Sequence, residues 1–485
     1  MEFNSYIFIL AYLPILICGY YALGKYKGAK FQNIYLIGAS LVFIGYGSVF
    51  TLILILMSAV CNYFLAKWIV NECDKSSKLK VGLGIGINLA VLGYFKYSSF
   101  FLDNLNSIFK TDWTLVHVFI PLGISFVTFQ QIIFLVEVSR RNILELSFED
   151  YLFYISYFPK FIQGPIAPYQ ELVNQFRDKD KKVVNADNLA YGLYLFAIGL
   201  AKKVLLADVL AKAVSYGWQN LYELSALEGI LTTLFFTLQI YFDFSGYSHM
   251  AIGVSKMLNI SILDNFDRPY LARSITDFWA KWHISLTNFL REYVYFPLGG
   301  NRKGKARTYI NIMIVYIISG LWHGASWNYV FWGLVHGIGN CFDRVVAQVW
   351  KRVTRWIQIP VTFIFVNFAW IFFRAPSIQD ALEMLKRLGI KNGWELTNGF
   401  AVVFHTSEVL FLQERFQFID TLLTQNPACV LGVFVVISFL VIVIGKDRVE
   451  PKFEPSVIKC VLTIAFLWWS ILSLSNVVEF IYANF

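Results

Sequence analysis

The chain has 485 residues, and only 15% of them are charged, against about 25% in an average soluble domain. With 57% hydrophobic residues, this composition excludes an ordinary soluble globular protein and predicts an all-α polytopic membrane protein. The net charge of +9 is spread over short loops between apolar runs, which is typical of a cytoplasmic face and argues against nucleic-acid binding.

Apolar runs follow one another along the chain, so we expect one integral-membrane domain over residues 1–485. We expect about eleven to thirteen transmembrane or re-entrant helices, since each span needs about twenty apolar residues. The candidate spans are residues 6–23, 34–65 (two spans bent near Gly45-Tyr46-Gly47), 81–101, 114–136, 188–214, 229–251, 309–336, 360–373, 428–444 and 457–474.

The first span follows Met-Glu directly, without a basic segment or a cleavage site, so we expect it to be retained. Basic loops at residues 25–30, 67–80 and 140–141 would then face the cytoplasm and leave the N-terminus outside.

Two regions are too irregular for clean spans. Residues 151–168 contain Pro159, Pro165 and Pro168, which predicts a broken, re-entrant segment buried inside the protein. Residues 260–305 mix aromatic and charged side chains, as at a membrane interface or a cavity wall. Residues 377–425 resemble an amphipathic, partly exposed segment.

His323 is an ionisable side chain inside a long apolar run, Ser319-Gly320-Leu321-Trp322-His323-Gly324. A titratable group at membrane depth is costly and indicates a functional site, and histidine suits proton transfer near neutral pH. The alternative is an inert histidine that packs between helices.

The other histidines carry weaker signals. His283 also lies in aromatic surroundings, whereas His336 follows His323 by thirteen residues, about 19 Å along one continuous helix, and is expected to be structural. We expect loop or packing roles for the remaining three, His117, His249 and His405. No metal-ligand spacing links histidines and carboxylates, so the sequence predicts no metal site.

Other polar residues form two sets. Asp243 and Ser245 are expected to form a polar network at a helix break. Arg302, Lys303 and Lys305 lie in a glycine-rich loop that could attract an anion or could simply flank the membrane.

Several stretches together resemble the membrane-bound O-acyltransferase family, in its alginate O-acetyltransferase subgroup. They are Leu92-Gly93-Tyr94-Phe95-Lys96-Tyr97, Pro121-Leu122-Gly123-Ile124-Ser125-Phe126, residues 158–165, Tyr241-Phe242-Asp243-Phe244-Ser245-Gly246-Tyr247-Ser248, residues 274–286, residues 298–302 and residues 320–324. The core motifs therefore occupy residues 92–336, and the helices of residues 356–485 are less typical.

The resemblance implies a ring of helices around a central tunnel in a bacterial inner membrane. Acetyl-CoA would be the cytoplasmic donor, with no permanently bound cofactor, and the acceptor would be an extracytoplasmic polysaccharide such as alginate, cellulose or peptidoglycan. A partner acetyltransferase outside the membrane would assist, and membrane lipid would surround the ring.

The resemblance also implies residue roles. His323 matches the catalytic histidine, and His283 matches the second histidine of the tunnel. On their charge alone, and not from the resemblance, Arg302, Lys303 and Lys305 are predicted to hold the phosphates of the donor, and Trp282 is predicted to contact the donor as well. Asp243, Ser245, Asn288 and Trp322 are predicted to be polar or structural residues of the tunnel.

Two other functions remain compatible with the sequence. Related proteins transfer D-alanine to teichoic acid, and a non-catalytic carrier could move a lipid-linked or acyl intermediate. For the enzyme, His323 could deprotonate the acceptor hydroxyl directly or act through an acyl-enzyme.

Overall fold

The computed structural model describes residues 1–70, 76–114, 119–143, 145–389, 393–450, 453–474 and 480–481. In these ranges the chain is built from helices, and its one extended pairing is an isolated bridge between Phe266 and Trp282. The predicted all-α class is therefore confirmed. His117 lies outside the described residues.

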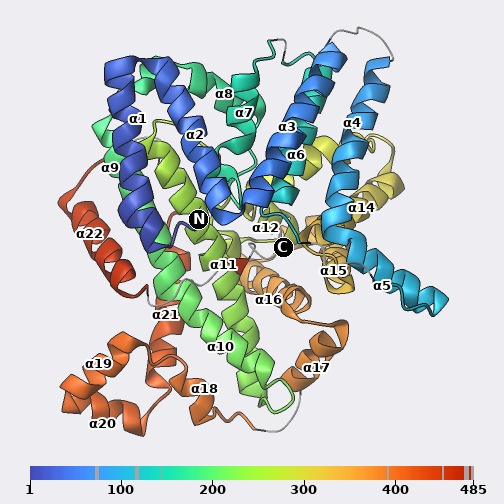
Figure 1. The fold of residues 1–485 in the computed structure, drawn as a ribbon. Coiled ribbons are helices and arrows are strands. Elements are labelled where there is room, and N and C mark those ends of the chain that lie inside the picture. The colour runs from blue at the N-terminus through green and yellow to red at the C-terminus, as the bar shows by residue number, and fades with distance from the viewer. Residues whose placement is uncertain are drawn as a thin grey trace.

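The N-terminal half of the chain forms a bundle (Figure 1). Its helices are η1 (Phe8–Tyr12), α1 (Leu13–Lys27), α2 (Ala29–Gly47), α3 (Val49–Val70), α4 (Ser76–Leu92), η2 (Gly93–Tyr97), α5 (Ser98–Phe109), α6 (Ile124–Ser139), α7 (Phe148–Ser156), η3 (Phe158–Lys160), α8 (Tyr169–Arg177), η4 (Asp180–Lys182), α9 (Ala186–Ala201), η5 (Lys202–Ala207), α10 (Asp208–Gln219) and α11 (Ala226–Met257).

The C-terminal half contributes shorter elements and several long helices. They are η6 (Pro269–Leu271), α12 (Ile275–Lys281), α13 (Ile284–Leu290), η7 (Arg291–Tyr295), α14 (Lys305–His323), α15 (Trp327–Trp350), α16 (Arg355–Arg374), α17 (Ile378–Gly389), α18 (Asn398–Val402), α19 (Ser407–Arg415), α20 (Gln417–Gln425), α21 (Cys429–Ile444) and α22 (Val457–Leu472). The expected partly exposed segment at residues 377–425 forms short helices with both buried and exposed residues: α17 packs against α11 and α16, and α18 to α20 lie at the bottom of Figure 1.

Four stretches of the described chain are long and apolar enough to cross a membrane. They are Phe8–Lys27, Val49–Val70, Lys78–Phe109 and Arg355–Arg374, and the bent pair α20 and α21, with 92° between its helices, would make a fifth. The predicted break between the second and third spans is confirmed, because α2 ends at Gly47 and Ser48 is extended.

The predicted span at residues 114–136 is wrong at its start. Helix α6 begins only at Ile124, because Gly123 has a φ of 73°, a left-handed conformation that is not part of a right-handed helix. Glycine suits this position also because a Cβ there would lie 2.8 Å from the Phe161 carbonyl oxygen. The sixteen residues of α6 are mostly buried in protein rather than turned toward lipid.

The predicted span at residues 309–336 is also wrong, because the chain folds back at its middle. Helix α14 ends at His323, Gly324 is extended, and Ser326 starts α15 by accepting a hydrogen bond from the Asn328 N–H. The two helices pack closely because Gly320 and Gly333 have no side chain, and a Cβ on either would collide with a carbonyl oxygen of the other helix.

The helix break expected at Asp243 and Ser245 is absent. Helix α11 runs without interruption for 32 residues, and Ser225 and Glu228 form a reciprocal capping box at its start. Both Asp243 and Ser245 lie in the middle of this helix, so their polar contacts must come from neighbouring elements.

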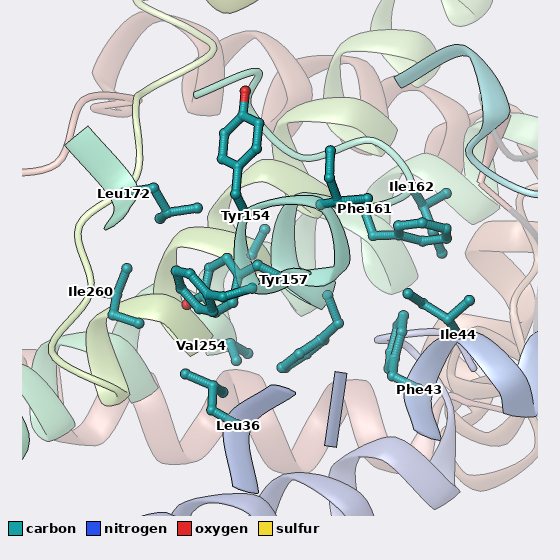
Figure 2. Packing of buried hydrophobic residues seen from close by; sticks show 14 of the residues in the cluster. Leu36, Phe43, Ile44, Tyr154, Tyr157, Phe161, Ile162, Leu172, Val254 and Ile260 are labelled. Carbon is teal, nitrogen blue, oxygen red and sulfur yellow. The ribbon is translucent and has the colours of Figure 1, made fainter. Parts of the chain in front are cut away.

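The broken segment expected at residues 151–168 is confirmed. After α7 the chain forms only the short η3 and then an irregular stretch, in which Phe158, Lys160 and Phe161 are fully buried. Figure 2 shows Tyr157, Phe161 and Ile162 of this segment among side chains of α2 and α11. Irregular backbone at membrane depth is tolerated in such a place, inside protein.

Candidate active site

His323 is the last residue of α14 and is 2% exposed. Its imidazole is enclosed by aromatic rings, with centroids at 4.8 Å (Trp322), 5.0 Å (Trp332) and 5.2 Å (Phe373). Substrates can therefore reach the imidazole only when surrounding side chains move.

The end of α14 is held from outside by the π-helical turn η2. The Lys96 ammonium donates hydrogen bonds to the Trp322 carbonyl oxygen and, at 3.2 Å, to Ser125 Oγ. The Tyr97 hydroxyl donates to the Leu321 carbonyl oxygen at 2.6 Å. These donors satisfy carbonyls that a helix leaves open at its C-terminal end, so they fix the backbone that carries His323.

His283 lies between α12 and α13, where the backbone has a φ of 45°. This left-handed conformation is unfavourable for a non-glycine residue and persists only where the surroundings impose it. The side chain is buried, and its ring lies 4.7 Å, edge to face, from Phe244 of α11. Neither imidazole nitrogen of His283 has a hydrogen-bond partner among the described residues.

Trp322 connects the two histidines. Its indole lies 4.8 Å from the His323 ring and 6.1 Å from the His283 ring, and it stacks on Phe129 of α6 at 5.3 Å. The structure thus gathers the two predicted histidines around one indole.

The separation of about 19 Å between His323 and His336 applies to one continuous helix, and the helix breaks after His323. Because the chain turns back after His323, both imidazoles contact Trp332, at 5.0 and 4.9 Å. His336 is fully buried, and its Nδ1 accepts a hydrogen bond from Trp279 Nε1 at 3.2 Å, as in the structural role expected of it.

The predicted polar residues of α11 form buried contacts with η5 and with Ile481 near the C-terminus. Asp243 pairs with Lys203 at 2.8 Å and accepts a hydrogen bond from the Ile481 N–H at 3.0 Å. Ser245 Oγ accepts from the Lys202 ammonium at 3.4 Å. This network joins α11 to its neighbours rather than bridging a helix break.

Asn288 and Trp282 lie on opposite sides of His283 in the chain. Asn288 is half-buried and accepts a hydrogen bond from Arg291 at 2.8 Å. Trp282 is 1% exposed and packs on Phe278 and Trp370, at 5.5 and 5.1 Å. A ligand could touch this indole only after displacing other rings.

Arg302, Lys303 and Lys305 are exposed at the opposite end of α14 from His323. The nineteen residues from Lys305 to His323 are separated by eighteen steps, which correspond to about 27 Å of helix. Arg140, in a predicted cytoplasmic turn, pairs at 2.7 Å with Glu292 of η7, which precedes this loop in the chain.

Lys96 is the site residue that the sequence analysis did not single out. It is 7% exposed within the span Lys78–Phe109. The sequence does contain a signal for Lys96, because a lysine inside an apolar run is, like a histidine, costly at membrane depth.

A cavity of about 460 Å³ lies beside these elements. Residues of the N-terminus, the 119–123 stretch and α11 line it, among them Phe3, Gly123 and Tyr247. Tyr247 is one helical turn from Phe244, which contacts His283, and Gly123 is two residues before Ser125, which contacts Lys96. Neither His283 nor His323 is among the described residues that line the cavity.

Known proteins resemble this chain over most of its length. A peptidoglycan O-acetyltransferase from Helicobacter pylori is 37% identical over 90% of this chain and 88% of its own length. The family model of the membrane-bound O-acyltransferases matches residues 135–378. The chain belongs to the membrane-bound O-acyltransferase family. It is accordingly a membrane protein and an O-acyltransferase.

Other relatives of this O-acyltransferase are named for other polymers, alginate and teichoic acid. A probable alginate O-acetylase from Pseudomonas aeruginosa is 35% identical over 82% of this chain and 76% of its own length. A teichoic acid D-alanyltransferase from Bacillus subtilis is 29% identical over 52% of this chain and 68% of its own length.

Proposed function

We propose that the protein takes an acetyl group from cytoplasmic acetyl-CoA and passes it across the inner membrane for O-acetylation of an extracytoplasmic polysaccharide. The observation that carries the proposal is the pair His283 and His323, buried on one indole in an O-acyltransferase. A peptidoglycan O-acetyltransferase and alginate O-acetylases match much more of the chain than the D-alanyltransferase does, which favours acetyl transfer to a glycan.

In this proposal His323 is the general base. His323 takes the hydroxyl proton as the oxygen attacks the thioester carbonyl, the carbon–sulfur bond then breaks, and the proton passes to the departing CoA thiolate. Positioned bases of this kind contribute roughly 10²–10⁴ in rate. The rings of Trp322, Trp332 and Phe373 would exclude water that competes with the acceptor. His283, with both nitrogens available, would hold the acceptor or the thioester oxygen.

The proposed path of the acetyl group runs from the basic loop, on the donor side, toward the cavity. Arg302, Lys303 and Lys305 would attract the phosphates of CoA, and the ring of eleven to thirteen membrane elements would surround a tunnel past His323. The 460 Å³ cavity would belong to the acceptor side, where an extracytoplasmic partner acetyltransferase would dock and where we place the N-terminus.

The test uses purified protein in liposomes with radiolabelled acetyl-CoA and a soluble glycan acceptor. His323→Ala should lower transfer by about 10²–10⁴ while the variant stays folded. The matched control is His405→Ala, a half-buried histidine whose Nε2 lies 3.4 Å from the Pro427 carbonyl oxygen in the C-terminal part. Equal transfer by His323→Ala and the unchanged protein would overturn the proposal.

Two further arms separate the alternatives. Release of free CoA thiol that depends on His323 distinguishes an enzyme from a carrier, because a carrier breaks no thioester bond. A D-alanyl carrier protein supplied in place of acetyl-CoA tests the D-alanyl alternative, and faster transfer from that donor would replace the acetyl assignment.

A further inference from the structure

The loop between α21 and α22 binds a segment that lies beside His283. Three of its residues contact residues 264–268. Asp447 Oδ2 accepts a hydrogen bond from the Arg268 N–H at 2.9 Å, Arg448 pairs with Asp267 at 3.0 Å, and the Val449 N–H donates to Asp264 Oδ1 at 3.3 Å. The loop lies beyond residues 135–378, which the family model matches.

Residues 264–268 in turn pair with the stretch that carries His283. The Asp267 N–H donates to the Lys281 carbonyl oxygen and the Ile284 N–H donates to the Asn265 carbonyl oxygen, both at 3.0 Å. Asn265 Oδ1 also accepts from Ser285 Oγ at 2.7 Å. The two stretches therefore fix the backbone on both sides of His283.

Asp447 anchors this arrangement in the centre of the protein. Its side chain is almost fully buried, and it accepts hydrogen bonds from the Lys202 ammonium at 3.0 Å and from the Tyr241 hydroxyl at 2.8 Å. Lys202 begins η5 and Tyr241 belongs to α11, so one carboxylate joins two core elements to Arg268.

We propose that Asp447 is a positioning residue for His283. Arg268 and His283 both have positive φ angles, of 48° and 45°, which non-glycine residues keep only when their surroundings impose them. Asp447 holds the Arg268 backbone, the 264–268 segment pairs with residues 281–285, and the imidazole is thereby fixed beside Trp322. This inference rests on the proposed role of His283 in acetyl transfer.

The test compares two double variants that both remove the buried ion pair. In Asp447→Asn/Lys202→Met the carboxamide oxygen still accepts from the Arg268 N–H, and its NH₂ can donate to the Tyr241 hydroxyl oxygen. In Asp447→Leu/Lys202→Met that acceptor is gone. For the Leu variant, kcat should fall about 10- to 100-fold with the KM for acetyl-CoA within about twofold, since small displacements of catalytic groups cost that much. The Asn variant should restore kcat.

A control variant weakens a different contact of the C-terminal part. Thr397 Oγ1 donates to Glu228 Oε1 at 2.6 Å, near the start of α11 and sixteen residues from Phe244. Thr397→Ala should keep wild-type kcat and KM. Equal kcat in the two double variants, or a loss in both that follows their thermal midpoints, would overturn the proposal.

His283→Ala separates this inference from the proposed function. If His283→Ala is inactive while both double variants are active, the positioning role of Asp447 fails and the role of His283 stands. If His283→Ala is as active as the unchanged protein, the assignment of His283 fails, and with it the reason for Asp447 to act through that residue.

Discussion

The buried ammonium group of Lys96 donates a hydrogen bond to the carbonyl oxygen of Trp322, the residue directly before His323. A lysine in one helical span therefore holds the end of another helix, α14, at the point where the proposed base lies. The cost of burying this side chain is offset only if the contact is kept. Substitution of Lys96 therefore tests whether acetyl transfer needs a fixed position of His323.

Lys96→Met should lower acetyl transfer by about 10- to 100-fold, because methionine fills the space but leaves the Trp322 carbonyl without its donor and lets His323 shift. Transfer from acetyl-CoA in liposomes measures the effect. Lys78→Met, at an exposed lysine in the first turn of α4, is the matched control and should keep full activity. Full activity of Lys96→Met would show that the end of α14 keeps its position without the hydrogen bond from Lys96 to the Trp322 carbonyl oxygen.

Gly320→Ala should destabilise the protein by about 1–3 kcal/mol, as overpacking of a tight interface does. The added methyl group would collide with the Tyr329 carbonyl oxygen and force α14 and α15 apart. The thermal midpoint in detergent measures the loss. Gly432→Ala in α21, where no atom of a neighbouring element would lie within 4 Å of the added methyl group, should not lower the midpoint. Equal midpoints for both variants would contradict the close packing of the hairpin.

Asp243→Ala should cost about 3 kcal/mol, near the low end for breaking a buried ion pair, because Asp208 still pairs with Lys203 at 2.8 Å. Chemical or thermal unfolding in detergent gives the value. Glu450→Gln removes two more exposed pairs, with Lys446 and Lys459, and should cost less, because water screens these interactions. A larger loss for Glu450→Gln would refute the anchoring role of Asp243.

The triple variant Arg302→Ala/Lys303→Ala/Lys305→Ala should raise the KM for acetyl-CoA while kcat at saturation stays near the wild-type value. These exposed side chains lie at or before the start of α14, and His323 is about 27 Å away at the other end of that helix, so they should act by attracting the donor. The wild-type KM should also rise with salt. Arg415→Ala, an exposed arginine in α19, is the control. An unchanged KM in the triple variant would contradict donor attraction by this loop and would indicate that the loop only flanks the membrane.

The sequence alone predicted the helical membrane class and the broken segment with Pro159 and Pro165, and it singled out His283 and His323 as candidates, because each of these is a local property. Proline cannot continue a helix wherever it lies, and an ionisable residue in an apolar run is costly in any membrane fold. These statements need no knowledge of which helices are neighbours.

Only the tertiary structure decided that the chain turns back after His323, that His336 comes close to it, and that Lys96 supports it. The reversal at Gly324 lies inside an apolar run that also suits one straight helix, and it is stabilised by the fit of Gly320 against Gly333 across two helices. The contacts of Lys96 with Trp322 and of Asp447 with Arg268 join residues more than 170 positions apart in the chain. Such contacts depend on the packing of distant segments, which no local pattern of residues encodes.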